Sequence, residues 1–259
     1  MYTHDNEVLI FEGFNAVKAA IFGIEGNVTN RKIIKVLFSQ SRLKKKTYEY
    51  NWLKVRSASL QFPIIICKDE EIAELCSSDT HGGIVGLFSK RDDLSLSDFS
   101  EHISNDGHGW LMALEGIEDP YNLGFCIRSA YAFGCSGILL PERYMYGADG
   151  TVCRSSAGAS ERIPFFRCDL VSASKIAKEN NFNVIAACEK DSVPMSSHPM
   201  SLPAILIIGG EKRGISAALL SECTDRIRIE YARAYNSSLS AVSASAIMSH
   251  MLALKNGLL

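Results

Sequence analysis

Two stretches of this 259-residue sequence carry side chains whose types and spacing can do chemistry. The first holds the amide of Asn122 and the guanidinium of Arg128, shortly after the turn signal Asp119-Pro120. The second is the loop Gly209–Gly214, which carries the carboxylate of Glu211. Glycines let a ligand approach the backbone, and free N–H groups before a helix favour oxygen-rich ligands. The sequence therefore predicts a binding site in which polar side chains meet a ligand of this kind.

The elements around Asn122 and Arg128 form one βαβ unit. Trp110–Leu114 is a continuous apolar run, as expected of a buried parallel strand, and Gly137–Leu140 is the next such strand. Asn122 is expected to cap the helix between them. Arg128 lies about 100° from the apolar face and therefore faces something polar. That face consists of Leu123, Ile127, Ala130 and Tyr131.

The glycine loop follows the apolar strand Ala204–Ile208 and precedes a helix that starts near Ile215. Gly209 and Gly214 have the spacing of a P-loop, but Ile215-Ser216 stands where that motif requires Lys-Ser/Thr. The glycine spacing of a dinucleotide-binding turn is also absent. A turn with a purely structural role remains an alternative for this loop.

A third region runs from Arg228 to His250 as a strand, a loop and a helix rich in Ala and Ser. The helix from Ala241 to Leu254 is expected to be buried in the core. The loop before it contains Ser238, Leu239 and Ser240.

These three regions resemble, in order and spacing, the three signatures of the SpoU-type (TrmH-like) RNA 2′-O-ribose methyltransferases of the SPOUT superfamily. Asp119–Gly134 matches D-P-x-N-L-G-x-x-x-R-x-A-x-x-F-G. Gly209–Gly214 resembles G-N-E-G-x-G-L-S, with Gly210 in place of Asn and Lys212 in place of Gly. Ser156–Pro164 adds a resemblance to the family's S-A-G-A segment.

The third signature, I-P-M followed by S-L-N-V-S, is matched by Ile229, Ser238 and Leu239. Glu230 stands for Pro, Tyr231 for Met and Ser240 for the usual Asn. An amide offers two donors and an acceptor, whereas a hydroxyl offers one donor, so Ser240 cannot reproduce the contacts of Asn. Asn236 is a candidate replacement from the same loop.

The resemblance implies S-adenosylmethionine-dependent 2′-O-ribose methylation of RNA, with ribosomal RNA favoured. The alternatives are a catalytically inactive RNA-binding paralogue and a transfer RNA ribose methyltransferase. The implied catalytic residues are Asn122, Arg128, Glu211, Ser238 and Ser240. The implied cofactor-binding residues are Gly209, Gly210, Glu211, Gly214, Ile229, Ser238 and Leu239. The resemblance also implies a C-terminal trefoil knot and a homodimer.

The composition also limits the classes of protein to which this chain can belong. Hydrophobic residues make up 47% and charged residues 22%, and no apolar run approaches the roughly 18 residues that span a bilayer. The N-terminal residues resemble no secretory signal, so a cytoplasmic location is expected. The eight cysteines are scattered without a C-x-x-C pair, and the six histidines have no ligand spacing, so we expect free thiols and no metal.

Strands that alternate with helices predict an α/β fold with a mainly parallel sheet. Gly13–Lys18 and Thr80–Val85 resemble the ribosomal-protein-like substrate-binding domain that precedes the catalytic domain in many SpoU-type enzymes. The resemblance implies a small α/β domain that binds the RNA substrate over residues 1–92 and a SPOUT methyltransferase domain over 107–259, with a linker over 93–106 between them. Although the formal net charge is −2, basic residues cluster between Asn27 and Arg56. The predicted RNA-binding residues are Arg31, Lys32, Arg42, Lys44, Lys45, Lys46 and Arg128.

Overall fold

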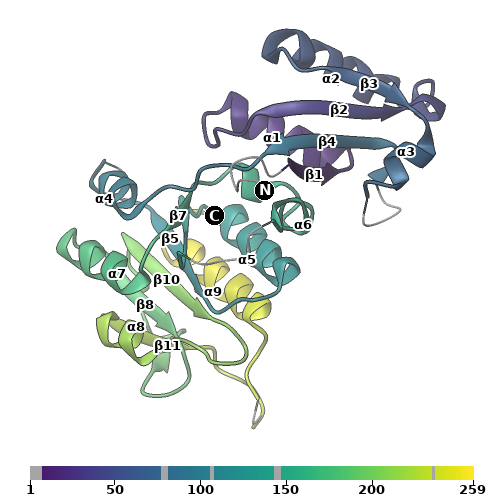
Figure 1. Cartoon of the computed structure of the whole chain (residues 1–259). Coiled ribbons are helices and arrows are strands. Elements are labelled where there is room, and N and C mark those ends of the chain that lie inside the picture. Colours follow the sequence, from purple (N-terminus) through teal and green to yellow (C-terminus); the bar gives the residue numbers. More distant parts are fainter. Residues whose placement is uncertain (1–7, 77–80, 106–107, 143–146, 235–236) are drawn as a thin grey trace, which may run out of the picture. The chain divides into compact units, whose positions relative to one another are not determined.

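The computed structural model describes residues 8–76, 81–105, 108–142, 147–234 and 237–259. These residues divide into two compact units (Figure 1). Unit 1 comprises Met1–Asp92 and Gly147–Arg162, and unit 2 comprises Asp93–Tyr146 and Ile163–Leu259. The first unit boundary falls after Asp92, and a segment from the second half of the chain belongs to unit 1.

Unit 1 contains a four-stranded sheet in the order β1-β4-β2-β3. Its strands are β1 (Val8–Glu12), β2 (Ile33–Ser39), β3 (Ile64–Cys67) and β4 (Ile84–Ser89). Its helices are α1 (Phe14–Glu25), α2 (Thr47–Leu60), α3 (Asp69–Ala73), α6 (Asp149–Ser155) and the short 3₁₀ helices η2 (Gln40–Arg42) and η4 (Ala159–Glu161). The helix expected from Phe14, Val17 and Ile21 is α1, whose Val17 and Ile21 are fully buried.

The segment Gly147–Arg162, expected to belong to the methyltransferase domain, packs against α1 and β1 instead. Glycines allow this close packing. A Cβ on Gly23 of α1 would lie 2.2 Å from the Glu161 carbonyl oxygen, and a Cβ on Gly150 would lie 2.1 Å from the Ile10 carbonyl oxygen. A Cβ on Gly158 would lie 2.4 Å from the Cβ of Ala19. Any side chain at these positions would push the segment away.

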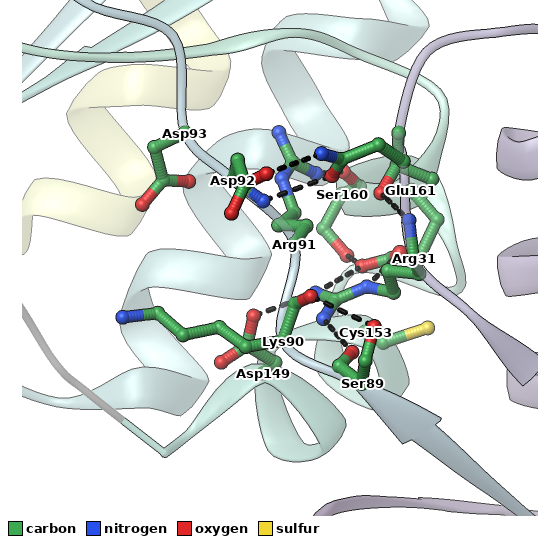
Figure 2. A network of polar contacts seen from close by, with 12 residues as sticks. Arg31, Ser89, Lys90, Arg91, Asp92, Asp93, Asp149, Cys153, Ser160 and Glu161 are labelled. Atoms are coloured by element: carbon green, nitrogen blue, oxygen red, sulfur yellow. Dashed lines mark hydrogen bonds and ion pairs between the residues drawn. The ribbon is translucent and has the colours of Figure 1, made fainter. Parts of the chain in front are cut away.

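Charge pairing inside unit 1 also fixes this segment (Figure 2). The Arg31 guanidinium donates to Glu161 over 2.8 Å from Nε and to Asp149 over 2.6 Å from Nη2. It also donates to the Ser89 carbonyl oxygen over 3.0 Å. Arg31 is 3% exposed. Its expected role in RNA binding is therefore wrong, because the guanidinium is enclosed and its charge is neutralised by carboxylates.

Unit 2 contains a seven-stranded sheet whose neighbouring strands are all parallel, in the order β7-β6-β5-β10-β8-β11-β9. The strands are β5 (Trp110–Glu115), β6 (Gly137–Leu140), β7 (Phe165–Arg167), β8 (Asn183–Ala187), β9 (Val193–Pro194), β10 (Ala204–Gly209) and β11 (Asp225–Arg228). The expectation of an α/β fold with a parallel sheet is confirmed.

Helices cover both faces of this sheet (Figure 1). On one face lie α4 (Leu96–Asn105), α7 (Leu170–Glu179) and α8 (Ala217–Glu222), which share a core with Leu111, Ile205 and Ile207. On the other lie α5 (Pro120–Ala132) and α9 (Ala241–Lys255), which pack side by side.

Helix α4 occupies most of the expected linker, residues 93–106. Phe99 and Ile103, four positions apart, are both buried in the core of unit 2. This spacing places them on one helical face, so the polar composition that suggested a linker describes only the exposed face of α4.

All eight cysteines are free thiols, and no group of three metal-ligating side chains occurs within the described ranges. None of the helices in the described part of the chain has the length and apolar character to span a membrane. The trefoil knot and the homodimer stay predictions.

Candidate active site

The glycine loop begins at the carboxyl end of β10 and packs directly against the end of β5. The Gly210 N–H donates to the Glu115 carbonyl oxygen over 2.7 Å, and the Gly214 N–H donates back to the Gly210 oxygen over 2.9 Å. The Glu115 side chain accepts from the Ser216 N–H over 2.7 Å. A Cβ on Gly210 would lie 1.9 Å from the Gly116 carbonyl oxygen, so only glycine fits there.

A cavity of about 440 Å³ lies beside this loop. It is lined by Gly209–Ile215, by residues that follow β8 and β11, and by the start of α9. In open parallel sheets, ligands bind in the crevice outside the carboxyl ends of the strands. The predicted cofactor residues Gly209, Gly210, Glu211, Gly214, Ile229, Ser238 and Leu239 all line this cavity.

A second cavity of about 140 Å³ shares Gly210, Glu211 and Lys212 with the first. Asn122 lines its other side. Within the described residues, neither the Asn122 amide nor the Glu211 carboxylate has a hydrogen-bond partner, so both are available to a ligand. The two polar groups predicted from separate signatures therefore meet at one small cavity.

The expected capping role of Asn122 is wrong. Asp119 is the N-cap of α5, and its carboxylate accepts from the backbone N–H groups of Tyr121 and Asn122. Pro120 occupies the first helical position, where a missing N–H costs nothing. The Asn122 side chain is thereby left for the cavity.

The loop before α9 is held by contacts that the sequence did not reveal. The Tyr231 hydroxyl accepts from the Leu239 N–H over 3.0 Å, and Ser238 Oγ donates to Glu189 Oε1 over 3.2 Å. Ser240 is the N-cap of α9, where its hydroxyl accepts from the Ser243 N–H, and it lines neither cavity. Asn236 lies outside the described residues.

Arg128 lies on the exposed face of α5 and also lines neither cavity. Of the predicted RNA-binding lysines and arginines in unit 1, Lys32, Arg42, Lys44 and Lys45 are exposed and Lys46 is half-buried. These five remain candidates for RNA contacts.

Sequence reasoning missed Glu189, Cys188 and Met248, which line the larger cavity. Cys188 and Glu189 directly follow β8, so the rule that ligands gather at the carboxyl ends of parallel strands could have found them. Burial raises the pKa of the Cys188 thiol. The hydrogen bond from Lys212 and the accompanying ion pair lower the pKa of the Glu118 carboxyl, which lines the smaller cavity.

Comparison with known proteins identifies the family of this chain. The model of the SpoU rRNA methylase family matches residues 110–250. The chain therefore belongs to the SpoU rRNA methylase family, a family of RNA methyltransferases.

Among similar proteins, a putative TrmH family tRNA/rRNA methyltransferase of Staphylococcus saprophyticus is 24% identical over 252 residues, covering 96% of this chain and 97% of that protein. The AdoMet-bound rRNA methyltransferase of Sinorhizobium meliloti has a similar fold, with a TM-score of 0.74 and 22% identity over 95% of this chain and 86% of that one. The SpoU methyltransferase AviRb of Streptomyces viridochromogenes has a TM-score of 0.76 and 16% identity over 97% of this chain and 90% of that one.

Proposed function

We propose that the protein transfers a methyl group from S-adenosylmethionine to a ribose 2′-hydroxyl of RNA, with ribosomal RNA as the substrate. One observation carries the proposal: two adjoining cavities at the carboxyl edge of the sheet share Glu211. In a methyl transfer, the donor and the attacking oxygen must be held next to each other in line. The larger cavity is assigned to the donor and the smaller one to the target hydroxyl.

The larger cavity suits S-adenosylmethionine in size and chemistry. Its 440 Å³ lies within the range of roughly 300–1,000 Å³ that is usual for small-molecule sites. Ile208, Ile229, Leu239 and Met248 provide apolar contact for the adenine ring. The Glu189 and Glu211 carboxylates suit the ribose hydroxyls and the positive charge of the cofactor. When bound, S-adenosylmethionine supplies an electrophilic methyl group.

The residues of the smaller cavity would position the ribose hydroxyl. The Asn122 amide can donate to the hydroxyl oxygen or accept its proton in a hydrogen bond, and the Glu211 carboxylate accepts only. The resemblance assigns to Arg128 a contact with the phosphate of the target nucleotide. Because a guanidinium is a poor base, Arg128 would stabilise the developing negative charge on the oxygen, and the Glu211 carboxylate would take the hydroxyl proton.

The position of Arg128 supports a homodimer. Arg128 lines neither cavity of its own chain, yet large apolar side chains near it are exposed on the same helix pair. These are Tyr121, Phe125 and Tyr131 of α5 and Ile247 and Leu254 of α9, between 38% and 53% exposed. An apolar surface of this kind marks an interaction site. A second copy packed there would bury these side chains and bring Arg128 to the neighbouring active site.

The test is transfer of labelled methyl groups to total RNA that lacks the native modification, followed by digestion to nucleosides. Label in 2′-O-methylnucleosides of ribosomal RNA supports the proposal, and label confined to transfer RNA selects that substrate instead. Label on a base contradicts ribose methylation. If cofactor and RNA both bind but no label is transferred, the inactive RNA-binding paralogue is the better description.

The role of Arg128 is tested separately. Arg128→Ala should leave folding and cofactor binding intact and lower transfer by about 10²-fold, the scale of a positioned activating group. If Arg128 acts in the site of a second copy, mixing inactive Arg128→Ala and Glu211→Gln chains should restore part of the activity, because one site per dimer is then complete. Mixed chains that stay inactive and a monomeric mass in light scattering would refute the dimer.

A further inference from the structure

Unit 1 contains a cavity of its own, of about 600 Å³, that is unrelated to the glycine loop. It is lined by the first turns of α1, the start of α2, His81 and Gly82, and by Arg154 and Arg162 of the segment Gly147–Arg162. Gly82 has a φ of 59°, a left-handed backbone conformation that favours glycine, and it lies close to the end of the Lys46 side chain. None of the three signatures includes this cavity.

Positive charge predominates in its lining. The cations are Lys18, Lys46, Arg154 and Arg162, and the carboxylates are Glu12 and Glu49. Arg154 is paired with Glu12 over 3.0 Å. Within the described part of unit 1, no carboxylate forms an ion pair with Lys18, Lys46 or Arg162. Cations gathered in a concave surface focus positive potential, which attracts phosphate groups.

Partly exposed aromatic rings border these cations. Lys18 Nζ lies 5.9 Å from the ring centroid of Phe14 and 5.8 Å from that of Trp52. The ring of Tyr48, a side chain that is 67% exposed, stands edge-on to Phe14 with the centroids 6.5 Å apart. Rings interleaved with cations are the usual platform for single-stranded nucleic acid, because bases stack on the rings while the cations contact the backbone.

We propose that this cavity binds an unpaired nucleotide of the RNA substrate, with its phosphate against Lys18, Lys46 and Arg162 and its base against Phe14, which lines the cavity, and the neighbouring exposed ring of Tyr48. The identification of the ligand as RNA rests on the proposed function. A base inside a continuous duplex is stacked and paired, so it cannot enter the cavity, whereas a base in a loop or bulge can. Unit 1 thereby selects RNA with an unpaired segment.

The test uses the full chain and a short fluorescent RNA oligonucleotide, single-stranded or annealed to its complement, in anisotropy titrations between roughly 50 and 200 mM salt. The variant Lys18→Met/Lys46→Gln removes two charges and keeps most of the aliphatic packing. Because a single-strand contact contributes about 0.7 to the logarithmic salt slope, the slope should fall by about 1.4. Tyr48→Ala should weaken single-strand binding about fivefold or more through lost stacking.

The matched control is Lys68→Gln/Lys175→Gln, which removes the same charge from exposed positions outside the cavity. It should leave affinity and salt slope unchanged. Circular dichroism and S-adenosylmethionine binding verify that each variant is folded. An unchanged slope for Lys18→Met/Lys46→Gln, or an equal loss for duplex and single strand, overturns the proposal.

Failure of this proposal is distinguishable from failure of the proposed function. If the unmodified protein transfers methyl groups to RNA while the cavity variants bind single strands normally, the cavity is not an RNA site and the enzymatic function stands. If the cavity variants lose single-strand binding but the unmodified protein transfers no methyl group, the RNA site stands and the enzymatic function falls.

Discussion

Replacing Glu161 by alanine should destabilise unit 1 by about 3 kcal/mol, because it removes one partner of a buried ion pair. The side chains of Arg31 and Glu161 are 1% and 2% exposed, and their N–O distance is 2.8 Å. Burial alone would lower the pKa of Arg31, but the carboxylates of Glu161 and Asp149 raise it above its ordinary value, so the guanidinium stays charged. Breaking such a pair typically costs about 3–5 kcal/mol. We expect the lower end, because Asp149 remains at 2.6 Å.

Urea unfolding followed by circular dichroism measures the loss, and hydrogen exchange of peptides from α1 and β2 assigns it to unit 1. Two variants make the measurement specific. Arg31→Met/Asp149→Asn/Glu161→Leu removes all three charges together and should recover much of the lost stability, because a buried ionic group can be replaced by uncharged side chains at little cost. Lys212→Gln breaks an exposed pair with Glu118, whose side chains are 79% and 64% exposed, and should leave stability unchanged.

The reasoning is refuted if Glu161→Ala and Lys212→Gln have equal effects, or if the triple variant is less stable than Glu161→Ala. Either result would mean that the Glu161 carboxylate does not stabilise the buried Arg31 charge beyond what Asp149 alone provides.

Three further predictions concern unit 2. Gly210→Ala should weaken S-adenosylmethionine binding about tenfold or more in calorimetry, because the new Cβ would displace the loop from Gly116; unchanged affinity would exclude the loop from the cofactor site. Ser240→Ala should cost about 1 kcal/mol in thermal unfolding through the lost cap of α9, whereas Ser240→Asn should keep stability, and equal losses would contradict a capping role. Cys188 should be alkylated slowly at neutral pH and faster as the pH rises through its raised pKa, because only the thiolate reacts. Bound cofactor should protect Cys188, which mass spectrometry after alkylation can show.

The sequence by itself determined the elements that depend on local order. Trp110–Leu114 and Ala204–Ile208 form strands because continuous apolar runs of this length are stable only when buried on both faces. The turn at Asp119-Pro120 and the glycines of the loop Gly209–Gly214 determine the backbone near the site, since their chemistry acts over a few residues. The spacing of these local features also carried the family resemblance.

Tertiary structure decided which side chains meet. The charge pattern could not distinguish buried Arg31 from exposed Lys32, because that difference comes from carboxylates more than 100 residues away. Nor could periodicity assign the segment Gly147–Arg162 to unit 1, since the glycine contacts that hold it are between elements distant in sequence.

Tertiary structure also decides which residues line the cavities. Asn122 and Glu211 come from separate signatures and meet only because β5 and β10 are neighbours in the sheet, which brings the ends of both strands together. Glu189 joins the larger cavity because β8 lies on the other side of β10. Local sequence sets each turn, but the order of strands in the sheet is a non-local property, and it determines the chemistry of the site.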